Sequence, residues 1–158
     1  MDLLGIYLND HLAGATAGAE LARRVAKAQQ RTKSGEAYKH LAEEIAEDRA
    51  ALLRMMRALH VPVQQYKVYA GWIAEKIGRL KPNGNLVNRS PLSDLQELEM
   101  MRLGIEGKAS GWRTLRPVAD HDDRLDADEL DELIARARRQ ADTIEELRTE
   151  TTEALFGR

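Results

Sequence analysis

The sequence contains no cysteine, and this absence removes several kinds of chemistry at once. Without thiols the chain has no disulfide bonds, no zinc-thiolate or iron–sulfur site and no cysteine nucleophile. Aromatic residues are also scarce, at 4% of the chain. Any ligand that this protein holds must therefore be bound by oxygen or nitrogen atoms, or by aliphatic packing.

Long apolar runs and a charge excess of one sign are missing as well. No stretch approaches the roughly 18 consecutive apolar residues that span a bilayer, and the N-terminal MDLLGIYLNDHLAGATAGAEL lacks the basic leader of a signal peptide. The net charge is only −2, so no overall field favours nucleic acid or an anionic membrane. The basic run RARR at 136–139 is interleaved with alanine and is expected on a salt-bridged surface. We expect a cytoplasmic protein that binds neither nucleic acid nor membranes.

What is present favours helices. A chain of 158 residues suits a single domain, 1–158, and Ala, Leu, Glu and Arg dominate it. Apolar residues recur at steps of three and four from about residue 2 to 30, which predicts a first helix with an alanine-rich core stripe. Gly14 and Gly18 in that segment should let a neighbouring helix approach closely. Ser34 is the expected N-cap of a second helix, which should end before Pro62.

Three more helices are expected further along the chain. The segment 64–80 reads as a short amphipathic helix, and the loop KPNGNLVNR follows it. A long helix is expected from Ser90 to about Leu115, because serine followed by proline is typical of a helix start. The last helix should open at Asp126 with a capping box. These elements predict an all-α four-helix bundle with a long crossover between its second and third long helices, which carries the short fifth helix.

Acidic residues crowd the apolar repeat HLAEEIAEDRAALL of the second helix, at 40–53. This stretch resembles the ferritin-like superfamily, whose second helix often carries a string such as LAEEExEHxxLL. The runs GWIAEKIGRLKPNG and SPLSDLQELE further resemble a bacterial group within that superfamily. The resemblance implies a ferritin-like up-down bundle with one long crossover. The residues that match the superfamily string are Leu41, Ala42, Glu43, Glu44, Glu47 and Leu52.

The ligand positions of that string are altered. Ferritin-like dimetal sites take one Glu from each of two helices and a Glu-x-x-His pair from each of the other two. The sequence contains no Glu-x-x-His, and Ile45 and Asp48 stand where the resemblance places a ligand Glu and a ligand His. We therefore expect no dimetal centre and no cofactor. The alternative is an atypical iron or manganese site built from His11, Glu44 and Asp48.

The helical wheel places Asp48 near the centre of the apolar stripe of its helix. A buried carboxylate needs a partner, because desolvation without compensation costs several kcal/mol. Arg102 lies close to the apolar stripe of the third long helix, and its guanidinium can bind a carboxylate bidentately. We predict a buried polar cluster of Glu44, Asp48 and Arg102, with Lys76 as a further member. The alternative is that Arg102 pairs with acids of its own helix and Asp48 meets water.

Most of the aromatic residues gather around the expected crossover: Tyr66, Tyr69 and Trp72, together with Trp112 on the third long helix. They could form a lid over a small apolar pocket, a dimerisation patch, or plain packing of the crossover on the bundle. The sequence favours a non-catalytic binding or protein-interaction module, present as a homodimer, with a small ligand or a protein as its partner. The alternative function is a ferritin-like metalloprotein that handles iron or acts as an oxidoreductase.

Overall fold

The computed structural model describes residues 2–64 and 90–157, and four long helices account for most of them. No strand occurs within these two ranges, so the all-α fold class is confirmed there. Residues 65–80 of the short helix expected at 64–80, Lys76 included, lie outside the described residues. The four helices are α1 (Leu3–Gln29), α2 (Gly35–Ala58), α4 (Pro91–Ala119) and α5 (Ala127–Phe156).

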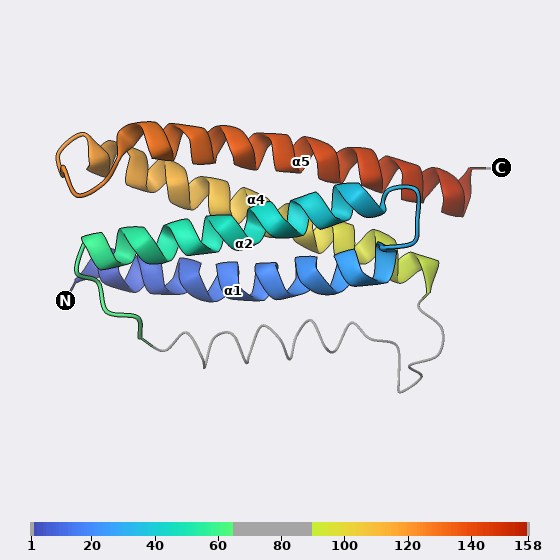
Figure 1. Ribbon diagram of the computed structural model, residues 1–158, viewed down its shortest axis with the longest axis horizontal. Coiled ribbons are helices and arrows are strands. Elements are labelled where there is room, and N and C mark those ends of the chain that lie inside the picture. Colours follow the sequence, from blue (N-terminus) through green and yellow to red (C-terminus); the bar gives the residue numbers. More distant parts are fainter. Residues whose placement is uncertain (1, 65–89, 158) are drawn as a thin grey trace.

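The helices form two antiparallel hairpins (Figure 1). α1 and α2 make the first hairpin; α4 then starts at the end of the bundle where α2 starts, so that α2 and α4 run in the same direction. α5 returns beside α4, and the C-terminus lies at the opposite end from the N-terminus. α1 packs against both α2 and α4, whereas α2 and α5 approach each other much less closely. Within 2–64 and 90–157, no helix combines the length and apolar character that crossing a membrane requires.

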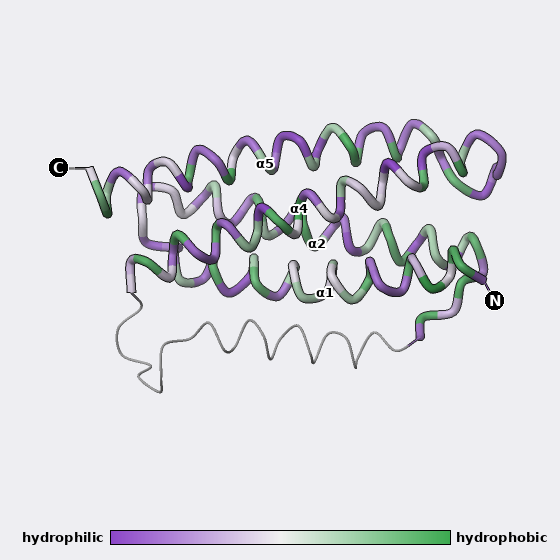
Figure 2. The backbone as a smooth tube through the Cα atoms, turned by 180° about the vertical axis from the view of Figure 1, so that it is seen from behind, coloured by the Kyte–Doolittle hydropathy of each residue, from purple (hydrophilic) through white to green (hydrophobic). Residues whose placement is uncertain are grey.

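The core is divided into two apolar clusters along the bundle axis. Hydrophobic and hydrophilic residues alternate along every described helix, as expected for amphipathic helices that each bury one face (Figure 2). One cluster contains Ile45 and Ile105, and the other contains Ala51 and Trp112. Asp48 falls between the two clusters on α2. The middle of the bundle is therefore the level at which polar residues enter the core.

The predicted helix starts differ in how they are capped. The Ser90 hydroxyl accepts a hydrogen bond from the backbone N–H of Leu92, and the Asp126 carboxylate accepts from two backbone N–H groups at the start of α5. Ser34 precedes α2 as expected but does not cap it with its side chain. Its hydroxyl instead donates to the Glu150 carboxylate near the end of α5, at 3.0 Å. That contact joins the α1–α2 turn to the second hairpin.

Candidate functional site

Asp48 lies at the centre of a buried group of polar side chains that we call the polar layer, made of Asp48, Lys108, Arg136 and Gln140. Asp48 is 1% exposed, and both of its carboxylate oxygens are used. Oδ2 accepts hydrogen bonds from the Lys108 ammonium at 2.6 Å and from the Gln140 amide at 3.0 Å. Oδ1 accepts from the Arg136 guanidinium at 3.1 Å. Donors from α4 and α5 thus converge on one carboxylate of α2, and these hydrogen bonds offset the cost of its desolvation.

Lys108 is the most deeply buried cation of the polar layer. Its side chain is 12% exposed, and its ammonium donates to Asp48 and to the Gln140 side-chain carbonyl at 2.5 Å. Burial lowers the pKa of Lys108, and the Asp48 carboxylate opposes this lowering. The Gln140 amide nitrogen donates to Asp48 and also to the Glu44 carboxylate at 3.2 Å. The lysine and the two carboxylates therefore fix which way the Gln140 amide points.

The predicted partner of Asp48 was wrong. Arg102 is 39% exposed, and its guanidinium pairs with Glu145 of α5 at 3.2 Å and with Glu106 of its own helix at 3.8 Å. At about 100° per residue, Arg102 and Lys108 lie on opposite flanks of the buried stripe of α4. Lys108 is on the flank that faces Asp48, whereas Arg102 is on the flank that faces Glu145.

Arg136 corrects a second expectation. The run at 136–139 was interpreted as exposed surface, but the Arg136 side chain is only 23% exposed and bridges Asp48 and Glu47. Lys108 and Gln140 were missed altogether, although a signal for them exists. Lys108 lies seven residues from both Met101 and Leu115, which are buried. Gln140 likewise has a buried leucine seven residues before it and another seven residues after it. A polar residue in a heptad series of core positions indicates burial.

The residues of the alternative metal site are not brought together. His11 packs on Tyr7 and against Gly111, whereas the oxygens of Asp48 are bound by two cations and an amide. Within 2–64 and 90–157, no three His, Asp or Glu residues are grouped so that they could hold a metal ion. The donor set around Asp48 therefore does not fit iron or manganese, since a divalent cation there would face Lys108 and Arg136.

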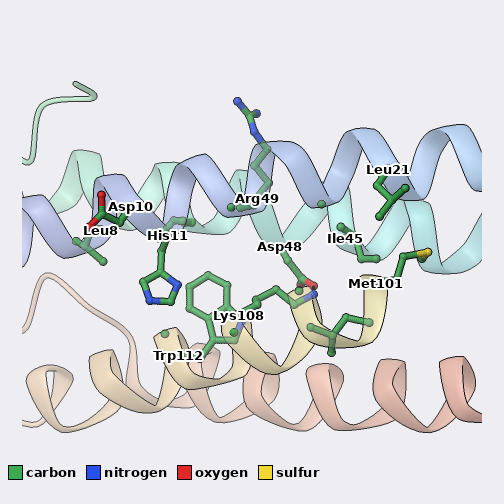
Figure 3. Close-up of a pocket in the computed structure, with 18 of the residues that line it drawn as sticks. Leu8, Asp10, His11, Leu21, Ile45, Asp48, Arg49, Met101, Lys108 and Trp112 are labelled. Carbon is green, nitrogen blue, oxygen red and sulfur yellow. Dashed lines mark hydrogen bonds and ion pairs between the residues drawn. The ribbon is translucent and has the colours of Figure 1, made fainter. Parts of the chain in front are cut away.

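A cleft opens between α1 and α4 at the level of the polar layer, and we call it the α1–α4 cleft. Its volume is about 400 Å³. Asp48 and Lys108 lie at its floor and reach toward each other from α2 and α4, while Leu21, Ile45 and Met101 extend along one end (Figure 3). Most of the remaining wall is aliphatic or glycine backbone.

The cleft exists because glycines face it from both helices. A Cβ atom placed on Gly14 or Gly18 of α1, or on Gly104 or Gly107 of α4, would meet no atom of residues 2–64 and 90–157 within 4 Å. All four residues line the cleft. The expectation that Gly14 and Gly18 allow close approach of a neighbouring helix was therefore wrong. Without side chains on either side, this part of the α1–α4 interface stays open.

His11 occupies the other end of the cleft and points from α1 toward α4 (Figure 3). Its ring centroid lies 4.4 Å from that of Tyr7, and the Tyr7 hydroxyl donates to Thr114 of α4 at 3.0 Å. A Cβ on Gly111 would approach His11 Nδ1 to 2.9 Å, so glycine is needed there for the imidazole to rest against the α4 backbone. Burial lowers the pKa of His11, and nearby Asp10 opposes this effect.

Trp112 forms part of the cleft wall and is 3% exposed. Its indole N–H is buried and has no hydrogen-bond partner among the described residues. The other aromatics that the sequence grouped with it, Tyr66, Tyr69 and Trp72, lie outside those residues, so the aromatic lid and the aromatic dimer patch stay predictions.

No protein-family model, curated protein or solved structure matches this chain. The proposed function therefore rests on the polar layer and the α1–α4 cleft.

Proposed function

We propose that the protein is a non-catalytic binding protein that holds a small, mainly apolar molecule in the α1–α4 cleft. The observation that carries this proposal is an open space of about 400 Å³ with aliphatic walls in the middle of a helical bundle. Small-molecule sites are commonly clefts of about 300 to 1,000 Å³ that are lined by apolar groups, and helical bundles build such sites between facing helices.

The state of the polar layer supports binding rather than catalysis at the floor of the cleft. General acid–base chemistry needs a group that is free to exchange a proton with the substrate. The Asp48 carboxylate accepts three hydrogen bonds, and the Lys108 ammonium is held by Asp48 and Gln140. These groups use one another's hydrogen-bonding capacity, so they close the floor of the cleft and hold its walls in position.

We also propose that the bundle is ferritin-like and that the polar layer stands in place of a metal centre. Two features support this relationship. The direction of the helices, with α2 and α4 parallel, is the one that a long crossover produces (Figure 1). In addition, Ile45 and Asp48, which stand at ligand positions of the superfamily string, are buried beside the cleft, and Asp48 is bound by Lys108 and Arg136.

The homodimer expected from the sequence stays a prediction, because only one chain is described. Multi-angle light scattering of the purified protein at several concentrations would check it. The binding proposal does not require a dimer, since the described residues that line the α1–α4 cleft all belong to α1, α2 and α4 of one chain.

Titration with 1-aminoanthracene, an uncharged dye that fluoresces strongly in apolar surroundings, tests the binding proposal. We expect saturable binding of one dye per chain. Gly18→Leu should weaken this binding at least about tenfold, which corresponds to about 1.4 kcal/mol, because leucine would fill the cleft. Ala28→Leu, an exposed position on the same helix that does not line the cleft, is the matched control and should leave the affinity unchanged.

Two results would contradict the proposal. One is the absence of saturable binding to wild-type protein that circular dichroism shows to be folded. The other is equal affinity in Gly18→Leu and Ala28→Leu, since the dye would then bind elsewhere on the surface.

A further inference from the structure

We infer that the ligand of the α1–α4 cleft is an uncharged molecule with an apolar body and one hydroxyl or carbonyl group that hydrogen-bonds to His11. This inference rests on the proposed function and adds the chemical class of the ligand. It follows from the charges around the cleft, from the hydrogen bonds of the polar residues that line it, and from the apolar surface between them.

The charged side chains that the described residues contribute to the cleft balance one another. They are two carboxylates, Asp10 and Asp48, and two cations, Arg49 and Lys108. Asp48 and Lys108 form a buried ion pair, and Arg136 binds the other oxygen of Asp48. An ionised ligand would therefore lose its hydration at the floor without gaining an uncompensated counter-charge, which is unfavourable.

The two charges nearer to solvent do not change this balance. Asp10 is exposed, so its attraction for a ligand cation is screened by water. Arg49 donates its Nε–H to the Thr16 hydroxyl at 2.9 Å, and its side chain extends away from the cleft (Figure 3). Arg49 is half-buried but points away from the cleft, and Asp10 is exposed, so neither residue presents its charge to a ligand inside the cleft.

His11 and the buried Trp112 indole N–H are both polar groups of the cleft that lack a hydrogen-bond partner among the described residues, but only His11 can accept a hydrogen bond as well as donate one. Neither of its ring nitrogens has a hydrogen-bond partner in the described part of the chain, yet Tyr7 and Gly111 hold the ring in place. Because burial lowers its pKa, His11 is neutral at pH 7, with one nitrogen as a donor and the other as an acceptor. A hydroxyl group matches either nitrogen, and a carbonyl oxygen matches the donor.

The apolar part of the cleft wall suits an apolar body. Leu8, Leu52 and Ile105 contribute aliphatic side chains to this wall, and the glycines leave room for a rigid ring system. Burial of such a body supplies binding free energy in proportion to its apolar area. A single hydrogen bond at one end would then select among apolar molecules of similar size.

A matched series of naphthalenes separates these contributions: naphthalene, 1-naphthol, 1-naphthaldehyde, 1-naphthoate and 1-naphthylmethylammonium. Each would be titrated at pH 7.5 by displacement of 1-aminoanthracene. We expect 1-naphthol and 1-naphthaldehyde to bind about three- to tenfold more tightly than naphthalene, the ratio that one net hydrogen bond supplies. The two charged members should bind at least about tenfold more weakly than 1-naphthol.

Variants of His11 assign the preference to its ring. His11→Phe should abolish the advantage of 1-naphthol while leaving the affinity for naphthalene within about twofold of wild type. His11→Gln, which keeps a donor and an acceptor, should retain part of the advantage. His121→Phe changes an exposed histidine away from the cleft and should reproduce the wild-type series.

The outcomes distinguish this inference from the function on which it rests. If 1-aminoanthracene binds in the cleft but 1-naphthol gains nothing over naphthalene, or a charged member binds most tightly, the inference is overturned and the binding function stands. If the advantage of 1-naphthol survives in His11→Phe, the assignment to His11 is wrong. If neither the dye nor any naphthalene binds, the proposed function itself fails.

Discussion

The two sides of α4 use small residues in opposite ways. Toward α5, Ala109, Ala137 and Ala141 are buried in one apolar cluster with larger residues such as Leu98 and Ile144. Toward α1, glycines of both helices line the α1–α4 cleft and border open space. A small residue brings two helices together only where the facing helix supplies a side chain to fill the space. Where small residues face each other at the same level, the interface stays open.

Removing the carboxylate of the polar layer should have the largest effect, because this layer adjoins both sides of α4. Asp48→Ala leaves Lys108 and Arg136 without their shared partner, and we expect the free energy of unfolding to fall by about 3 to 5 kcal/mol. Chemical denaturation measures it. The double variant Asp48→Leu/Lys108→Met should recover much of this loss, because it removes both members of the buried ion pair and leaves Arg136 paired with Glu47. A loss below about 1 kcal/mol for Asp48→Ala would show that Asp48 is not a buried, paired carboxylate.

Enlarging a small residue should affect the two sides differently. Ala141→Leu introduces three carbon atoms into a filled interface, and we expect it to destabilise the protein by about 1 to 3 kcal/mol. Gly104→Leu introduces a larger increment into open space and should leave stability unchanged or raise it, because leucine favours a helix more than glycine does. Thermal and denaturant unfolding of both variants check this. Equal losses of stability in the two variants would show that the two interfaces of α4 are packed alike.

A smaller change at the cleft should be stabilising. Gly104→Ala adds one methyl group at a position where no described residue places an atom within 4 Å, so the main change is in the conformational preference of the backbone. We expect a gain of about 0.5 to 1 kcal/mol in the free energy of unfolding. The matched control is Gly111→Ala, where the new methyl group would meet the His11 ring. That variant should lose stability, and a gain there would show that His11 is not held against α4.

The pH dependence at the cleft should be the smallest effect. Burial lowers the pKa of His11 below its ordinary value of 6.5, the Asp10 carboxylate opposes this lowering, and the Tyr7 ring contacts the imidazole. The unfolded chain then binds more protons than the folded one as the pH falls through 6.5, so the free energy of unfolding decreases with falling pH. Denaturant titrations between pH 7.5 and 5 should show a shallower decrease in His11→Phe. An identical decrease would assign it to other groups.

The helices could be predicted because their signals are local. Spacing of apolar residues at three and four predicts a helix regardless of its neighbours, and the N-caps at Ser90 and Asp126 follow from the adjacent residues. The end of α4 was less accurate, since the helix continues beyond Leu115, through Pro117, to Ala119. There the side chains of the last turn pack against the core, which a local pattern does not reveal.

The polar layer could be predicted only in part. The helical wheel places Asp48 in the interior because that depends on α2 alone. Its partners depend on how α4 and α5 are rotated and shifted along the bundle, and this is why Lys108 and Gln140 were missed and Arg102 was wrongly chosen. The cleft was harder still, since it arises from the absence of side chains on two helices that only the folded structure brings to the same level.

Nuclear Overhauser effects between 1-naphthol and the methyl groups of the protein would show most directly whether the α1–α4 cleft binds a ligand. We expect contacts from the naphthalene ring to Met101, Ile45 and Ile105, which line the cleft. Contacts confined to exposed residues such as Leu3, or to Ile144 on the packed side, would contradict binding in the cleft.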